Sequence, residues 1–144
     1  MHLALLMVLL TANVTIGYVV APVLFGRLSS EMAGELMGVF LTGLYGFDLI
    51  FMSVLLLMLI VQKRFRAKRE ALLVVSSLLV AANLWGISPL MTELKSMGLA
   101  TSPELFGMTF AQWHGISQAL FMLMLGLLVV WGIGLRKGQT VKSA

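Results

Sequence analysis

The chain has 144 residues, of which 60% are hydrophobic and 11% are charged, and its formal net charge is +4. Soluble domains carry about 25% charged residues, so this composition excludes an ordinary soluble domain and indicates an integral membrane protein. The basic residues gather beside apolar segments, as membrane topology signals do, and we expect the lipid bilayer rather than nucleic acid as the partner. The sequence contains no cysteine, which excludes disulfides, thiolate metal sites and cysteine nucleophiles.

Four segments are long and apolar enough to cross a bilayer as helices, which takes roughly 20 residues each. They cover residues 1–26, 36–62, 71–92 and 109–135. The first segment lacks a basic region before its long apolar run, so we interpret it as a retained span and not as a signal peptide. Short connections make neighbouring helices antiparallel. The sequence therefore predicts an all-α membrane protein with a single four-helix domain over residues 1–144, arranged as an up-down bundle.

The charges of the loops predict the orientation of the four spans. Four spans place both termini and the 63–70 loop on one side of the membrane, and this side carries eight Lys or Arg residues. The opposite side carries two, Arg27 and Lys95. By the positive-inside rule both termini face the cytoplasm. We expect a multi-pass protein of the cell membrane, and specifically of a bacterial inner membrane.

The segment before the fourth span carries helix-start signals. In "TSPE" the order of residues suits Ser102 as N-cap, Pro103 as the first helical residue and Glu104 in the first turn, so we expect this helix to begin before the membrane. Trp113 and Trp131 suit the outer and the cytoplasmic aromatic belts.

Small residues repeat along one side of the second span. Bilayer helices associate through close backbone approach, which small residues permit. We expect an internal helix contact along this stripe, and a homo-oligomer formed through it is the alternative. The residues of this glycine stripe are Gly34, Gly38, Thr42 and Gly46.

One acidic residue, Asp48, lies in the middle of the second span. A carboxylate at the bilayer centre costs about 3 kcal/mol on insertion scales, so it should face protein or water. Arg27 and Lys95 lie beyond the outer helix ends and cannot reach it. We therefore expect neutral partners, and we predict a polar pocket formed by Asp48, Asn13, Tyr45, Asn83, His114, Ser117 and Gln118.

These polar residues have two main interpretations. The first is an interhelical hydrogen-bond network in a structural or accessory membrane protein. The alternative is a binding or transport module for a small solute, coupled to a proton or cation at Asp48. A redox protein that uses haem or quinone is a weaker alternative, because His2 and His114 lie near opposite faces and cannot ligate one iron.

The sequence carries no motif that indicates catalysis, phosphate binding or metal binding. It has no phosphate-binding loop, nucleophile elbow, zinc motif or carboxylate pair. We therefore predict no catalytic residue, no metal site and no cofactor. The small-molecule ligand stays unassigned, and the sequence leans away from an enzyme.

Three segments carry a resemblance to a known family: "GYVVAPVLFGRL", "AGELMGVF" and "WHGISQALFMLMLGLLVVWG". Together they resemble the transmembrane protein 205-like domain of unknown function, DUF4149. The resemblance spans nearly the whole chain and rests most on Pro22, Phe25, His114, Gly115 and Ser117. It implies a four-helix membrane domain and names no substrate.

Overall fold

The computed structural model describes residues 1–63, 65–98 and 103–140, and nearly all of them are helical. The first seven helical elements are α1 (His2–Val14), η1 (Thr15–Val20), α2 (Ala21–Arg27), α3 (Ser30–Val61), α4 (Ala67–Ala81), η2 (Ala82–Ile87) and α5 (Ser88–Ser96). Two short strands, β1 (Glu104–Leu105) and β2 (Met108–Thr109), precede the last helix, α6 (Phe110–Thr140). The segments η1 and η2 are π-helical turns within longer rods.

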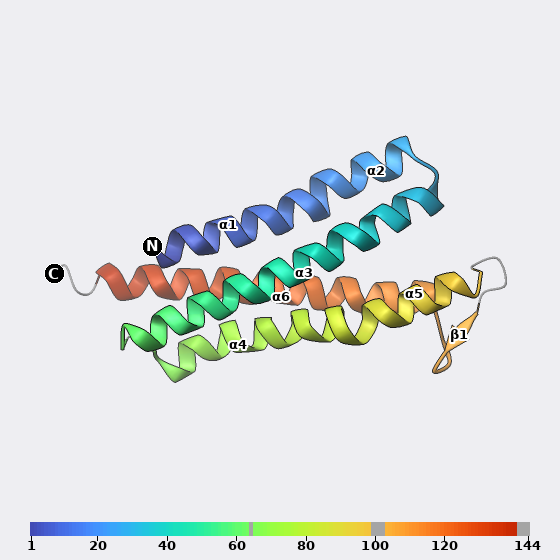
Figure 1. Cartoon of the computed structure of the whole chain (residues 1–144). Coiled ribbons are helices and arrows are strands. Elements are labelled where there is room, and N and C mark those ends of the chain that lie inside the picture. The colour runs from blue at the N-terminus through green and yellow to red at the C-terminus, as the bar shows by residue number, and fades with distance from the viewer. Residues whose placement is uncertain (64, 99–102, 141–144) are drawn as a thin grey trace.

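Four rods are long and apolar enough to cross a membrane: His2–Arg27, Ser30–Val61, Ala67–Ser96 and Phe110–Leu135. They confirm the prediction of an all-α protein with four membrane spans. In Figure 1 successive rods run in opposite directions, and α1 begins at the end of the bundle where α6 finishes.

Two helices begin earlier than the sequence predicted. Helix α3 starts at Ser30 and not at residue 36, because Ser29 caps it: the Ser29 backbone is extended and its Oγ accepts from the Met32 N–H at 3.4 Å. Helix α4 starts at Ala67 and not at residue 71. Hydropathy marks the apolar stretch, whereas each of these helices continues into the polar sequence beside it.

The segment before the fourth span also differs from the prediction. Strands β1 and β2 pair as an antiparallel hairpin, and its turn is formed by Phe106 and Gly107, which have φ values of 54° and 71°. Glu104 is therefore in a strand, and its predicted place in the first turn of a helix is wrong. Ser102 lies outside the described residues.

Helix α6 begins at a different cap. The Gln112 Oε1 accepts from the Thr109 N–H at 2.8 Å, and the Thr109 Oγ1 accepts from the Gln112 N–H at 3.5 Å. This reciprocal pair is a capping box of the Thr-x-x-Gln kind. It satisfies backbone donors at the edge of the apolar run, so the helix starts there and the residues before it are free to form the hairpin.

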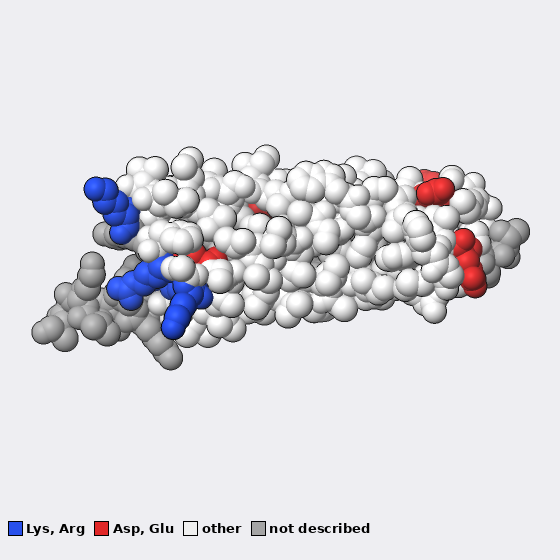
Figure 2. All heavy atoms as spheres, turned by 90° about the horizontal axis from the view of Figure 1, so that it is seen from below, with Lys and Arg blue, Asp and Glu red and all other residues white. Residues whose placement is uncertain are grey.

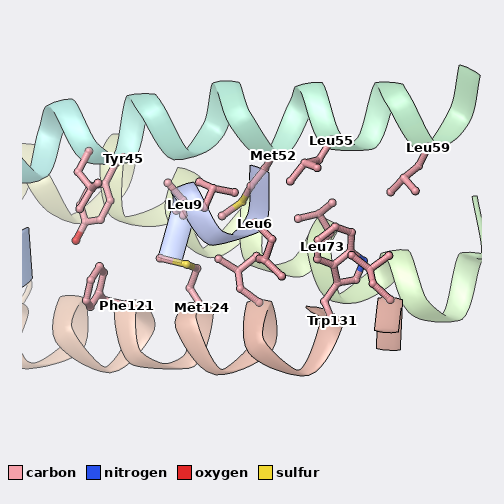
Figure 3. Packing of buried hydrophobic residues seen from close by; sticks show 14 residues of the cluster. Leu6, Leu9, Tyr45, Met52, Leu55, Leu59, Leu73, Phe121, Met124 and Trp131 are labelled. Atoms are coloured by element: carbon pink, nitrogen blue, oxygen red, sulfur yellow. The ribbon is translucent and has the colours of Figure 1, made fainter. Parts of the chain in front are cut away.

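The core lies where α1, α3, α4 and α6 meet (Figure 3). Met52, Leu55 and Leu59 of α3 follow a spacing of three and four residues, which places them on one face of the helix. All three are at most 1% exposed. Figure 3 shows this face directed toward the other helices, so the bundle has a continuous packed interior.

Charged side chains separate toward the two ends of the bundle. Figure 2 shows Lys and Arg at the end where the N-terminus lies in Figure 1, and most of the visible Asp and Glu at the opposite end. Between the two ends the visible surface is nearly free of charge. This distribution is typical of a protein that crosses a bilayer.

Candidate functional site

The carboxyl of Asp48 is fully buried and is bonded to Asn13. The Asn13 Nδ2 donates to the Asp48 Oδ1 at 2.8 Å and to the Leu9 carbonyl at 2.9 Å. Both side chains are 0% exposed. Among the described side chains, no Lys or Arg nitrogen lies within 4.0 Å of this carboxyl. The bond joins α1 to α3, and the partner of the acid is a neutral amide.

A second buried pair joins η2 to α6. The Asn83 Nδ2 donates to the Ser117 carbonyl at 3.4 Å, and these residues are 1% and 3% exposed. Tyr45 of α3 is buried, at 2% exposure, and its side chain interacts with Ser117 and with Asp48. Figure 3 shows its hydroxyl directed away from α3 toward α6. We call these five residues the polar layer: Asn13, Tyr45, Asp48, Asn83 and Ser117.

Three oxygen atoms of the polar layer have no hydrogen-bond partner among the described residues. They are the Asn13 Oδ1, the Asp48 Oδ2 and the Asn83 Oδ1, and all three are buried. A buried polar atom left without a partner costs about 1–3 kcal/mol. The layer therefore has more acceptors than donors. A proton on the carboxyl, a water molecule or a monovalent cation would each satisfy such oxygens.

Two residues of the predicted pocket lie outside this layer. His114 and Gln118 are exposed, although Ser117 beside them is buried. Each residue of an α-helix is rotated by about 100° from the one before it, so three residues at these positions spread over a wide arc. Of these three residues, Ser117 alone lies on the inward face of α6. The His114 ring instead stacks against Phe110 with ring centroids 6.0 Å apart.

The glycine stripe of α3 makes no close contact with another helix among the residues that the structure describes. The Lys95 Nζ donates to the Gly34 carbonyl at 3.0 Å, and a Cβ added at Gly38 would lie 3.9 Å from this amine. A Cβ at Gly46 would meet no atom within 4 Å. A lysine side chain thus lies over the outer part of the stripe, where we expected a neighbouring backbone. The homo-oligomer formed through the stripe stays a prediction.

An open groove lies between α3 and the second half of the third span. Its walls are mostly the side chains of α5, with one residue from α3 and one from η2. The lining residues are Thr42, Leu84, Ser88, Pro89, Thr92, Glu93 and Ser96. None of the five residues of the polar layer lines this groove.

A second buried polar cluster, which the sequence did not suggest, lies near the end of the bundle where α1 begins (Figure 1). The Trp131 Nε1 donates to the Glu70 Oε2 at 2.6 Å, and the Arg69 Nε donates to the Glu70 Oε1 at 2.7 Å. Glu70 and Trp131 are both 0% exposed. The predicted place of Trp131 in an aromatic belt is therefore wrong.

The sequence carried no periodic signal for Trp131, because residues 119–135 are all apolar or glycine. In the structure the buried residues of α6 recur every three or four positions, and Trp131 continues this series after Met124 and Leu128. Figure 3 shows its ring among the packed apolar side chains. For Glu70 no signal existed either, because it follows a run of basic residues that reads as a solvated loop.

The family model for the domain of unknown function DUF4149 matches residues 4–100, which is most of the chain. The chain belongs to the DUF4149 family. The match confirms the resemblance seen in the sequence. It includes Asn13, Asp48, Asn83 and Glu70 of this DUF4149 protein and ends before α6. Comparison with curated proteins gave no match, and comparison with solved structures gave none either.

Proposed function

We propose that this multi-pass membrane protein is a structural or accessory component of the cell membrane, and that its polar layer holds the four spans in one arrangement. The observation that carries the proposal is the Asn13–Asp48 bond of 2.8 Å, made by two fully buried side chains on different spans. The Asn83–Ser117 bond joins the other two spans at the polar layer. Each span therefore contributes to the layer.

The small free energy of each hydrogen bond explains how the polar layer acts. Hydrogen bonds between membrane helices contribute on average about 0.6 kcal/mol and at most about 1.7 kcal/mol. A slipped or rotated helix, however, would leave buried amide and carboxyl groups without partners, and each such group costs about 1–3 kcal/mol. Apolar helices in lipid have many packings of similar energy. The polar layer favours one of them by penalising the others.

Substitution of Asp48 tests this proposal. Asp48→Leu removes the acceptor of the Asn13 amide, so we expect the free energy of unfolding to fall by about 1–3 kcal/mol. Asp48→Asn keeps an acceptor oxygen for Asn13 and should melt within a few degrees of the parent. The measurement is thermal unfolding in detergent. Ser53→Leu, at an exposed position of the same helix, is the matched control and should have little effect. Equal melting of Asp48→Leu and Ser53→Leu would contradict a structural role for the layer.

A second candidate function is a proton- or cation-coupled binding or transport module at Asp48. The observation that favours it is the set of three buried oxygens without partners. Asp48→Asn separates the two candidates, because it removes the ability to ionise while it keeps the shape. A structural layer predicts that a deletion strain is complemented by Asp48→Asn as well as by the parent. A transport module predicts normal folding and no complementation.

Infrared difference spectra of the parent against Asp48→Asn give an independent measurement of this second candidate. A protonated Asp48 gives an acid carbonyl band, and binding of Na⁺ or K⁺ in its place would convert this band into carboxylate bands. A purely structural layer predicts the same spectrum with and without the salt.

The orientation is a further part of the proposal: both termini face the cytoplasm of a bacterial cell. The chain has no cysteine of its own, so single cysteines can be labelled selectively. Ser29 and Ala67 are exposed and lie at opposite ends of the bundle. In intact cells an impermeant thiol reagent should label Ser29→Cys, and it should label Ala67→Cys after permeabilisation alone. Labelling of Ala67→Cys in intact cells would reverse the orientation.

A further inference from the structure

The bundle consists of two helical hairpins with the same construction. In each hairpin the first rod is interrupted and the second is continuous: α1, η1 and α2 are followed by α3, and α4, η2 and α5 are followed by α6. Both interruptions are π-helical segments of six residues, and each is followed by a proline at the start of the next α-helix, Pro22 or Pro89. Figure 1 shows both hairpins starting at the same end of the bundle. Because π-helix makes up well under 1% of residues, its occurrence at both equivalent places indicates a common plan.

The two interrupted rods also share a buried asparagine. An Ala-Asn pair lies close to the start of each interruption: Asn13 is two residues before η1 begins, and Asn83 is the second residue of η2. Both asparagines are at most 1% exposed. Buried side-chain amides are costly in a membrane interior, so their place beside both interruptions is a specific similarity.

The two continuous rods align on their polar residues. Placing Asp48 on Ser117 also places Gly46 on Gly115. Under this alignment the burial pattern of residues 50–61 is identical to that of residues 119–130.

A spacing of three and four residues recurs in any bundle helix, so the burial pattern alone proves little. The specific feature is the polar residue four positions before the first buried residue of that pattern, at Asp48 in α3 and at Ser117 in α6. In both rods it is buried.

The two polar bonds connect equivalent positions. The Asn13 amide reaches a residue 35 positions later, and the Asn83 amide reaches one 34 positions later. In the first hairpin the acceptor is a carboxyl oxygen at 2.8 Å, and in the second it is the backbone carbonyl of Ser117 at 3.4 Å. A serine side chain is shorter than that of aspartate, which accounts for the different acceptor.

We propose that the chain is a tandem repeat of a two-helix unit, and that Asn83 with Ser117 is a second copy of the Asn13–Asp48 site. Parallel repeats in membrane proteins are related by an axis along the membrane normal, and their sites lie near the midplane where the repeats meet. The first copy carries the carboxyl of the layer and is the copy that can exchange a proton. The second copy is its neutral counterpart, built to the same geometry. This inference holds whether the layer is structural or binds a ligand.

The equivalence is tested by moving the acid from one copy to the other. Asp48→Ser alone should lower the melting temperature of the full chain, because the Asn13 amide loses its carboxyl acceptor. Adding Ser117→Asp should recover part of this loss, because the new carboxyl gives the Asn83 amide a stronger acceptor than the backbone carbonyl at 3.4 Å. The matched control adds Gln118→Asp instead, which places the acid on the adjacent, exposed residue, and it should recover nothing. The repeat is rejected if the swapped variant melts no higher than Asp48→Ser.

A second measurement applies if Asp48→Ser does not fold. Asp48→Asn keeps the first copy bonded, and Ser117→Asp in this background leaves one carboxyl in the layer. Its acid carbonyl band should exchange with deuterium as slowly as that of Asp48 in the parent. The proposal would be overturned if this band exchanged with deuterium as fast as the acid band of the double variant Asp48→Asn, Gln118→Asp. Loss of folding on adding Ser117→Asp to a folded Asp48→Asn protein would overturn it equally.

Discussion

Replacement of Trp131 by alanine is expected to lower the free energy of unfolding by about 3 kcal/mol, the largest effect of a single substitution that we predict. The Trp131 ring is 0% exposed, and its Nε1 donates to the Glu70 carboxyl at 2.6 Å. Alanine leaves a cavity between the helices and removes one donor from a buried carboxylate. Lipid is as apolar as the core, so the cost comes from lost packing and from the lost hydrogen bond. We therefore expect the lower end of the range known for buried tryptophans.

Two further variants give this experiment its controls. Trp131→Phe keeps most of the ring volume and loses the donor, so its melting temperature should fall between those of the parent and Trp131→Ala. Trp85 is 71% exposed, and Trp85→Ala should be nearly neutral. The measurement is unfolding in detergent, followed by circular dichroism because tryptophan fluorescence changes with each variant. If Trp131→Ala melts like Trp85→Ala, the Glu70–Trp131 cluster does not hold α4 and α6 together.

Gly132→Ala is expected to destabilise the bundle by about 1–3 kcal/mol through overpacking. A Cβ at this position would overlap the Leu6 side chain. Leu6 is 2% exposed and is surrounded by other core residues, so it has little room to move. Alanine is otherwise the better helix former, which makes a loss of stability at this glycine diagnostic of close contact between α1 and α6.

Gly126 on the same helix provides the matched control, because a Cβ there would meet no atom within 4 Å. Gly126→Ala should be neutral or slightly stabilising. Combining Gly132→Ala with Leu6→Ala should cost less than the sum of the two single changes, since the smaller side chain makes room for the new methyl group. Unfolding in detergent measures all four variants. Strict additivity, or equal melting of the two glycine variants, would show that α1 and α6 are not in close contact here.

The two polar clusters act at different depths of the bundle. The polar layer joins α1 to α3 and η2 to α6, whereas the Glu70–Trp131 bond joins α4 to α6 near the end of the bundle where α4 begins. Hydrogen bonds at two positions of α6, Ser117 and Trp131, determine both the rotation of this helix and its position along the bundle axis. We therefore expect substitutions in one cluster to weaken the bundle without abolishing the other cluster.

The sequence by itself determined the class of the protein and its four spans. Span length and apolar content are properties of a continuous segment, so they can be evaluated without any knowledge of neighbouring helices. The same holds for Asp48, because a carboxyl in an apolar span must find polar partners wherever the helices lie. Asn13 was predicted as one of those partners, and the structure places its amide 2.8 Å from the carboxyl.

The tertiary structure alone decided which side of each helix faces inward. It placed His114 and Gln118 on the surface, and it buried Trp131 against Glu70. Hydropathy cannot make these choices, because lipid and protein interior are equally apolar and either one can cover the same side chain. What decides is the packing of particular neighbours, such as the Trp131 ring against the first turn of α4. Such contacts join residues that are far apart in the chain.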